Sequence, residues 1–349
     1  MRILAAMGYR VGVVGASGYS GGELLRLLAG HDEFEACVIA AGTKAHQPVG
    51  AVHPGLVALG AEVFADTDPA SLADLDLVFL ALPHGQSAAL AAQLPASVRI
   101  VDLGADHRLR SPEQWETYYG TGAHADPWPY GLPELPGARR RIAMASRVAG
   151  PGCYATAVTL SAWPLLAAGL MDPELVVVAA SGTSGAGRVP SDGLMASEVM
   201  GAMKPYKVAG VHQHTPEIEQ TLSDEADTPV TVSFTPLLAP MPRGILATTS
   251  APAAAGVTTD HVRQCLAAAY HDEPFVHVLP PDQWPTTGAT CGANTALIQA
   301  AVDSHAGRVV VVTAIDNLQK GAAGQALQCA NLMLGLPEAL GLPTMGVAP

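Results

Sequence analysis

Near the start of the chain, residues 11–24 read VGVVGASGYSGGEL, with Gly12, Gly15 and Gly18 spaced as G-x-x-G-x-x-G. The apolar run before the glycines predicts a buried strand, and the leucines after them predict a helix. Glycines at such a turn let backbone amides approach a pyrophosphate, whose charge the helix N-terminus favours. This context predicts dinucleotide binding rather than an ordinary tight turn. The residues expected to contact the cofactor here are Gly12, Gly15, Ser17, Gly18, Tyr19 and Ser20.

Strand-like and helix-like runs alternate outward from this turn through the first half of the chain. Strands are expected at 11–14, 34–41, 77–82 and 99–103, with helices at 23–28 and 87–94. This alternation predicts a doubly wound parallel sheet of the Rossmann type. From 111 to 147, a stretch rich in proline, glycine and aromatic residues shows no clear element.

The second half has a different pattern, in which strand-like runs dominate and helices are few. The runs are 175–180, 230–235, 245–250, 295–302 and 309–315, and a closing helix is expected at 324–334. Such a pattern predicts an α+β domain with a mainly antiparallel sheet. The chain is therefore expected to be an α/β protein of two domains, as its 349 residues allow.

The end of the second expected strand indicates which dinucleotide binds. Sites for NAD place Asp or Glu there, where the carboxylate bonds the ribose hydroxyls. This chain has no carboxylate at that point and carries Thr43 and Lys44 instead. A hydroxyl and a cation suit a 2′-phosphate, so NADP(H) is the predicted cofactor. The alternative is that Lys44 is a solvated loop residue.

Composition narrows the functional classes. The chain is 49% apolar with a formal net charge of −13, and its one basic triplet, Arg139–Arg141, is interpreted as a solvated loop. Nucleic-acid binding is therefore not expected. Neither a signal peptide nor a membrane span is expected at the N-terminus. The five cysteines are odd in number and lack a C-x-x-C spacing, which indicates a reducing compartment, so the protein is expected to be soluble and cytoplasmic.

Cys153 differs from the other cysteines by its position. The Gly-Pro-Gly segment 150–152 precedes it, and 154–170 is predicted to be an apolar helix. A thiol at a helix N-terminus ionises readily because the local field lowers its pKa. Cys291 is ambiguous, and three cysteines fit the role of buried small hydrophobes: Cys37, Cys265 and Cys329. Cys153 is therefore the candidate nucleophile.

A nucleophilic thiol needs an acid or base nearby in space. Residues 212–217 read HQHTPE and supply His212, His214 and Glu217. Either histidine can act as the acid/base, and a structural role for both is the alternative. An H-x-H spacing can also bind metal, but no third ligand is evident, so a metal site is not expected.

Three further segments follow strands and carry residues suited to an anion. Pro83 and His84 follow one strand and are expected to contact the cofactor. Arg108 follows another strand, where a guanidinium can clamp a phosphate. The third is the Gly/Ser loop 181–188. Its expected cofactor contacts are Ser181, Gly182, Ser184 and Gly185.

Eight segments, in order along the chain, resemble the N-acetyl-gamma-glutamyl-phosphate reductase family. They are GASGYSGGEL (15–24), ALPHG (81–85), DLGADHRL (102–109), PYGLPEL (129–135), PGCYAT (151–156), SGTSGAGR (181–188), HQHTPEI (212–218) and IDNLQKGAAGQA (315–326). The resemblance runs from about residue 10 to the C-terminus and is greatest to actinobacterial members. The family is similar to the aspartate-semialdehyde dehydrogenases and shares their two-domain fold and tendency to form oligomers.

The resemblance implies a step of arginine biosynthesis, the NADPH-dependent reduction of N-acetyl-gamma-glutamyl phosphate to N-acetylglutamate 5-semialdehyde. Cys153 would attack the acyl phosphate, and hydride would reduce the resulting thioester. His214 is favoured as acid/base because Thr-Pro-Glu follows it, with His212 kept open. Arg108 and Glu217 are the candidates for substrate binding.

The same resemblance places Asn317 near the nicotinamide and so returns the chain to its first domain. The expected domains are 1–152 with about 318–349 for dinucleotide binding, and 153–317 for catalysis and oligomerisation. A homo-oligomer, dimer or tetramer, acting on a small molecule is expected.

Other functions compete with this one. An aspartate-semialdehyde dehydrogenase would run the same chemistry on a smaller acyl phosphate, but the segments around Cys153 and 212–217 speak against it. A reductase of carrier-bound aminoadipate would have to bind an acidic carrier, which a chain of net charge −13 repels unless it has a basic patch. A non-catalytic dinucleotide sensor does not need a cysteine at a helix N-terminus. A thiol hydrolase or acyltransferase leaves the glycine turn unexplained.

Overall fold

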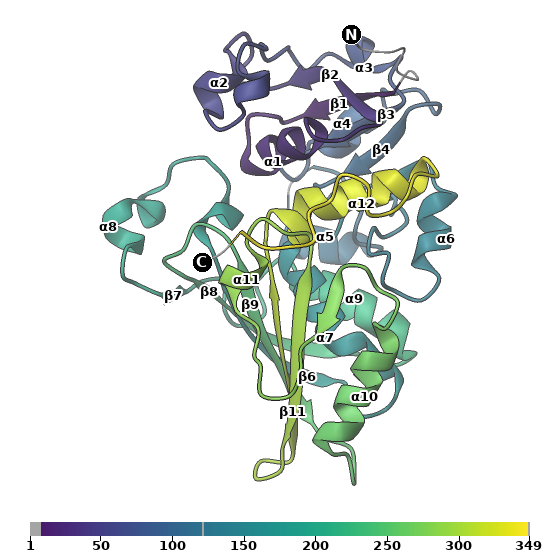
Figure 1. Ribbon diagram of the computed structural model, residues 1–349, viewed down its shortest axis with the longest axis vertical. Helices are drawn as coiled ribbons and strands as arrows, with labels where there is room; N and C mark the ends of the chain where they lie inside the picture. The colour runs from purple at the N-terminus through teal and green to yellow at the C-terminus, as the bar shows by residue number, and fades with distance from the viewer. Residues whose placement is uncertain (1–7, 121, 348–349) are drawn as a thin grey trace. The chain divides into compact units, whose positions relative to one another are not determined.

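The computed structural model describes residues 8–120 and 122–347, which form two compact units (Figure 1). Among these residues, the first unit comprises 8–133, Gly137–Pro151 and Ala322–Leu342, and the second comprises Glu134–Pro136, Gly152–Gly321 and 343–347. The expectations for residues 1–7 and for 348–349 lie outside the described residues. In the part of the chain that is described, no helix has the length and apolar character to cross a bilayer.

A five-stranded sheet in the order β2-β1-β3-β4-β5 forms the centre of the first unit, and each neighbouring pair is parallel. The strands are β1 (Tyr9–Val14), β2 (Phe34–Ala40), β3 (Leu77–Leu80), β4 (Arg99–Asp102) and β5 (Arg147–Ala149). The helices are α1 (Tyr19–Leu28), α2 (Val49–Val52), η1 (Val57–Leu59), α3 (Pro69–Leu72), α4 (Ser87–Ala91), α5 (Pro112–Tyr118), α6 (Ala138–Ala143) and α12 (Gly324–Met333). The expected parallel α/β sheet is confirmed.

The strands of this sheet are apolar because they are buried. All four residues of β3 are buried, and Val14, Leu80 and Ile100 join one hydrophobic cluster. Burying such a side chain contributes about 1.5–3 kcal/mol. Sheets of this kind bind ligands beyond the carboxyl ends of their strands. The glycine turn after β1 lies at such an end.

The stretch 111–149 contains three elements that the sequence pattern did not reveal, namely α5, α6 and β5. Each is short, so too few residues repeat for a period to show. Arg139–Arg141 belong to α6, and the interpretation of this triplet as a loop is therefore wrong. Arg139 pairs with Glu338, their Nε and Oε2 atoms 2.8 Å apart.

A seven-stranded sheet in the order β10-β11-β12-β9-β6-β8-β7 forms the centre of the second unit. The strands are β6 (Glu174–Ser181), β7 (Lys204–Pro205), β8 (Thr231–Leu238), β9 (Ile245–Pro252), β10 (Val276–Val278), β11 (Ala296–Asp303) and β12 (Arg308–Ile315). The helices are α7 (Cys153–Ala167), η2 (Thr183–Ala186), η3 (Asp192–Leu194), α8 (Ala196–Val199), α9 (Thr215–Ala226), α10 (Thr259–Ala269) and α11 (Thr287–Thr290). The pairs β10–β11 and β6–β8 are parallel and the other four are antiparallel, so the sheet is mixed.

Helices cover one face of this mixed sheet (Figure 1). α7 packs against β9 and β12, α9 packs against β8, and α10 packs against β11. α7 is apolar all round because it lies between the sheet and the other two helices. On the other face alternate strand residues stay exposed, and in β6 Val176 and Val178 are 44% and 41% exposed. The sheet therefore has one covered face and one open, partly apolar face.

Candidate active site

Cys153 is the first residue of α7. The residue before it, Gly152, has extended backbone, and its N–H donates to Oε1 of Glu217 at 2.7 Å. Glu217 is completely buried in the first turn of α9. This carboxylate fixes the turn that leads into α7. The thiol thereby stands at a helix N-terminus, where the helix field favours a thiolate.

His214 immediately precedes α9, and its ring lies against Gly152. A Cβ on residue 152 would come within 2.5 Å of the His214 Nε2. Glycine at 152 is therefore what lets the imidazole lie over the backbone one residue before Cys153. The beginnings of α7 and α9 bring a thiol and an imidazole into one place, although 60 residues of sequence, from Tyr154 to Gln213, separate them.

His212 has a different environment, because its side chain is buried among aromatic rings. Its ring centroid lies 5.4, 5.0 and 5.7 Å from those of Tyr154, Phe234 and Tyr206. The N–H of His214 donates to the His212 Nδ1 at 3.1 Å. Burial, and next the charge of His214, lower the pKa of His212 to about 2. His212 is therefore uncharged near neutral pH and holds the backbone that carries His214.

The lowered pKa of His212 predicts a pH-dependent stability. The unfolded chain takes up a proton at this histidine near pH 6.5, whereas the folded chain does so near pH 2. The free energy of unfolding therefore falls as the pH drops below about 6.5, because the unfolded state binds the extra proton. In His212→Phe, urea titrations from pH 7 to pH 5 are expected to show a weaker pH dependence than in the wild type. An unchanged dependence contradicts this, and His305→Phe, at an exposed histidine, is the control.

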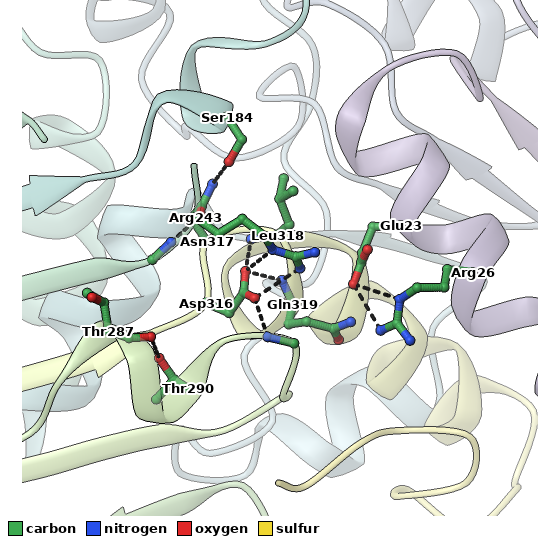
Figure 2. Close-up of polar contacts among 12 residues, drawn as sticks. Glu23, Arg26, Ser184, Arg243, Thr287, Thr290, Asp316, Asn317, Leu318 and Gln319 are labelled. Atoms are coloured by element: carbon green, nitrogen blue, oxygen red, sulfur yellow. Dashed lines mark hydrogen bonds and ion pairs between the residues drawn. The ribbon is translucent and has the colours of Figure 1, made fainter. Parts of the chain in front are cut away.

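The Gly/Ser loop after β6 is tied to the segment after β12 (Figure 2). Asn317 is buried, its Oδ1 accepts the Gly244 N–H at 2.7 Å, and its Nδ2 donates to the Ser184 Oγ at 2.9 Å. A Cβ on Gly185 would lie 3.1 Å from the Ser181 Oγ. Four of the expected cofactor contacts therefore lie together in the second unit. Gly182, the fifth residue expected here, packs on backbone, since a Cβ there would lie 2.7 Å from the Arg243 nitrogen.

Asp316 and Arg243 belong to the same cluster and were missed by the sequence analysis. Asp316 is completely buried, and its Oδ2 pairs with the Arg243 Nη2 at 2.9 Å (Figure 2). It also accepts the N–H groups of Leu318 and Gly292, at 2.8 and 2.7 Å. These bonds fix the backbone around Asn317. In the sequence, the polar pair Asp316-Asn317 directly after an apolar strand could have marked this position as functional. Only the fold shows that Arg243 is the partner of Asp316.

The glycines of the first unit have separate roles. Gly15 has a φ of +80°, and a Cβ there would lie 2.2 Å from the Ala81 carbonyl oxygen, so backbone and packing both demand glycine. Gly12 is buried in β1, where a Cβ would lie 2.8 Å from the Leu75 side chain. Gly18 precedes α1, and a Cβ there makes an ordinary contact, 3.4 Å from Gly15. The start of α1 therefore leaves room for an anion beside its amides.

Thr43 and Lys44 follow β2 and are both exposed. Next to them, a Cβ placed on Gly42 would meet no described atom within 4 Å beyond its chain neighbours. β1 and β2 are parallel, so this loop and the glycine turn follow the same ends of adjacent strands. The site after β2 has the space and the cation that a phosphate needs.

Pro83 and His84 lie in the loop after β3, and both are exposed. Asp106 holds this loop, because its carboxylate accepts the N–H groups of Gly85 and Ala88 at 2.7 and 3.0 Å. The sequence pattern around Asp106 predicted no role for it. Its burial, at 1% exposed, and its two bonds assign it the support of this loop.

Arg108 is buried within the first unit, where its guanidinium donates to backbone carbonyls. Nε donates to the Gly150 oxygen at 2.7 Å, and Nη2 donates to the Leu103 oxygen at 2.8 Å. The first bond joins the loop after β4 to the loop after β5, and the second lies within the loop after β4. The geometry gives Arg108 a bracing contact that the sequence did not suggest.

Comparison with known proteins identifies the family. The chain is 65% identical over 344 residues to the N-acetyl-gamma-glutamyl-phosphate reductase of Acidothermus cellulolyticus, covering 98% of this chain and 100% of that relative. The chain belongs to the N-acetyl-gamma-glutamyl-phosphate reductase family. The homologue of Streptomyces avermitilis is 56% identical over 343 residues, again covering 98% and 100%. Both relatives therefore match along their whole length.

Two domain families match successive segments of this reductase chain. Residues 10–144 match the NAD binding domain of semialdehyde dehydrogenases, and 153–317 match their dimerisation domain. Aspartate semialdehyde dehydrogenase II from Vibrio cholerae has a TM-score of 0.71 at 15% identity, covering 95% of this chain and 99% of that one. Aspartate semialdehyde dehydrogenase with NADP from Candida albicans has a TM-score of 0.66 at 17% identity, covering 94% and 98%. These structures show a shared fold.

Proposed function

We propose that the chain is the NADPH-dependent enzyme that reduces N-acetyl-gamma-glutamyl phosphate to N-acetylglutamate 5-semialdehyde and phosphate in arginine biosynthesis. The observation that carries this is the thiol of Cys153 at a helix N-terminus, with the His214 imidazole against the residue before it. A thiolate is a strong nucleophile, and an adjacent imidazole can accept and return its proton. The names of the full-length relatives supply the substrate.

In the proposed reaction, His214 accepts the thiol proton and the Cys153 sulfur attacks the acyl carbon. The carbon–oxygen bond to phosphate breaks, phosphate leaves, and a thioester remains on Cys153. NADPH, when bound, supplies the hydride that this thioester needs. His214 then donates its proton as the thiohemiacetal forms and takes it back as the carbon–sulfur bond breaks, which releases the aldehyde and restores the thiolate.

His214 is the better candidate for this proton transfer than His212. A general acid/base must take up and release a proton near the working pH. The pKa of His212, lowered to about 2 by burial, excludes that at neutral pH. His212 fits the role of a neutral acceptor that orients His214.

Two clusters are proposed to hold the cofactor. In the first unit, the turn at 15–20 would receive the pyrophosphate, and Thr43 and Lys44 would bind the 2′-phosphate. Pro83 and His84, in the loop after β3, would also contact the cofactor. The room beside Gly18 and Gly42 supports this fit. In the second unit, the loop 181–185 and Asn317 are proposed for the nicotinamide end, supported by their mutual bonds.

Lys44→Ala tests the choice of NADPH over NADH. Loss of a charge-assisted bond to the 2′-phosphate is expected to raise KM for NADPH about tenfold, with little change for NADH, which lacks that phosphate. The measurement is steady-state kinetics with each cofactor. Lys204→Ala is the control, since Lys204 bonds the Gly193 carbonyl in the second unit. Equal KM values for NADH and NADPH in the wild type contradict the proposal.

The domain roles follow the two units. We propose that 1–152 with about 318–349 bind the dinucleotide and that 153–317 carry catalysis and oligomerisation. The division between Pro151 and Gly152, and between Gly321 and Ala322, lies within a few residues of these boundaries and supports them, whereas Glu134–Pro136 and residues 343–347 belong to the second unit. Arg108 and Glu217 are proposed to bind the substrate, and each also braces backbone through its bond to Gly150 or Gly152.

A homodimer through the open face of the seven-stranded sheet is proposed for the second unit. The match of 153–317 to a dimerisation domain and the exposed Val176 and Val178 support it. Val178→Glu places a charge on that face and is expected to shift the sedimenting species to the monomer mass, because a buried unpaired charge is costly. Val57→Glu, at a valine 85% exposed in η1, is the control and should leave the mass unchanged. A dimer that persists in Val178→Glu contradicts the proposed face.

The experiment that tests the function runs the reaction backwards. Purified protein is given N-acetylglutamate semialdehyde, phosphate and NADP⁺, and the absorbance of NADPH is followed. Formation of NADPH that requires both phosphate and the semialdehyde is expected. Preference for aspartate semialdehyde, offered as competitor, would overturn the substrate assignment.

A further inference from the structure

Lys320 and Glu134, which both belong to the second unit, form a completely buried ion pair. Their Nζ and Oε1 atoms are 2.6 Å apart, and both side chains are 0% exposed. The Lys320 Nζ also lies 5.5 Å from the centroid of the Phe275 ring. Removing two charges from water is costly, and apolar residues of similar volume often serve stability as well. Such a pair therefore points to a positioning role.

Lys320 belongs to η4 (Gln319–Ala323), a single π-helical turn between β12 and α12. Turns of this kind are wider than an α-helix and occur often at functional sites. The next residue, Gly321, lies directly against the nucleophile, since a Cβ on it would come within 2.8 Å of the Cys153 Cβ. The Gly321 N–H donates to the backbone carbonyl oxygen of Asp316 at 3.0 Å. The position of this turn therefore sets the space available to Cys153.

Glu134 reaches Lys320 from a distant part of the sequence. It lies in the short segment Glu134–Pro136, which belongs to the second unit. The chain on both sides of this segment belongs to the first unit. The ion pair thus ties η4 to a chain segment 186 residues away. Two contacts therefore hold η4: the backbone bond from Gly321 to Asp316, and the ion pair of the Lys320 side chain with Glu134.

We propose that Lys320 and Glu134 are positioning residues, whose ion pair holds η4 so that Gly321 fixes Cys153 at the start of α7. A displaced η4 would let Cys153 leave the orientation in which the helix N-terminus and His214 activate it. The inference rests on the proposed role of Cys153 as the nucleophile.

The test measures the pH dependence of iodoacetamide alkylation at Cys153, together with kcat and KM. Glu134→Asp keeps both charges but shortens the reach by one methylene, and a Lys320→Met/Glu134→Leu double variant removes both charges at similar volume. In each, the alkylation profile is expected to move to higher pH and kcat to fall roughly 10- to 100-fold, since small displacements in an active site have effects of that size. KM for NADPH is expected to stay within about twofold.

A purely structural pair gives a different result, in which the melting temperature falls while the alkylation profile and kcat stay those of the wild type; this overturns the proposal. If the double variant does not fold, Glu134→Asp alone decides. Arg139→Met, which breaks the pair with Glu338 in the first unit, is the control and should keep the wild-type profile. Alkylation needs no substrate, so this inference is decided even if the reverse reaction shows that the proposed function is wrong.

Discussion

Cys153→Ser is expected to lower kcat by at least about 10⁴-fold while NADPH still binds, the size of loss that follows removal of a covalent nucleophile. A serine hydroxyl has nearly the same volume, so the start of α7 and its bond from Gly152 to Glu217 should persist. The hydroxyl does not ionise near neutral pH, however, and the helix N-terminus cannot lower its pKa far enough. Reaction rate is therefore lost without loss of the fold.

Two measurements check this result. Fluorescence titration of NADPH should give a similar Kd for the variant and the wild type. Cys291→Ser, at another half-buried cysteine of the second unit, is the matched control and should keep near-normal kcat. A kcat for Cys153→Ser within about tenfold of the wild type would mean that no thioester forms on Cys153.

His214→Asn is expected to lower kcat by roughly 10²- to 10⁴-fold, the usual contribution of a general acid/base. The ring of His214 lies against Gly152, the residue before Cys153, and is proposed to exchange a proton with the thiol from there. His212→Asn keeps an oxygen that can accept the His214 N–H but loses the aromatic contacts, so a smaller loss of kcat is expected.

The pH profile separates the two histidines. The limb of the kcat profile that the general acid/base produces should disappear in His214→Asn and persist in His212→Asn, because burial keeps His212 uncharged down to about pH 2. If His212→Asn is the inactive variant and His214→Asn retains most of its activity, the assignment is wrong.

Much of the fold is readable from local patterns. The glycine turn with its flanking strand and helix predicts the parallel sheet of the first unit, and the runs at 175–180, 245–250 and 309–315 fall within β6, β9 and β12. The mixed pairing of the second sheet is not readable. Whether two strands pair in parallel depends on the path of the chain between them, and β6 and β8 carry no mark of their orientation.

Some of the candidate site residues are likewise readable from the local sequence, and others are not. Cys153 stands out in the sequence because the residues that place it, a Gly-Pro-Gly segment and an apolar helix, are its neighbours in the chain. The choice between His212 and His214 is not local, since it depends on which ring the fold buries among aromatic side chains. That Glu217 accepts the Gly152 N–H is likewise visible only in the fold, and its contact with the substrate stays a prediction.

The sequence by itself therefore determined the family and pointed to the candidate nucleophile and the candidate dinucleotide turn, because each is encoded by residues that are adjacent or in a fixed order. Only the tertiary structure decided which groups surround the thiol. The pair of Asp316 with Arg243 and the pair of Lys320 with Glu134 join residues 73 and 186 positions apart. Burial and charge pairing are properties of the packed chain, so no local pattern specifies them in advance.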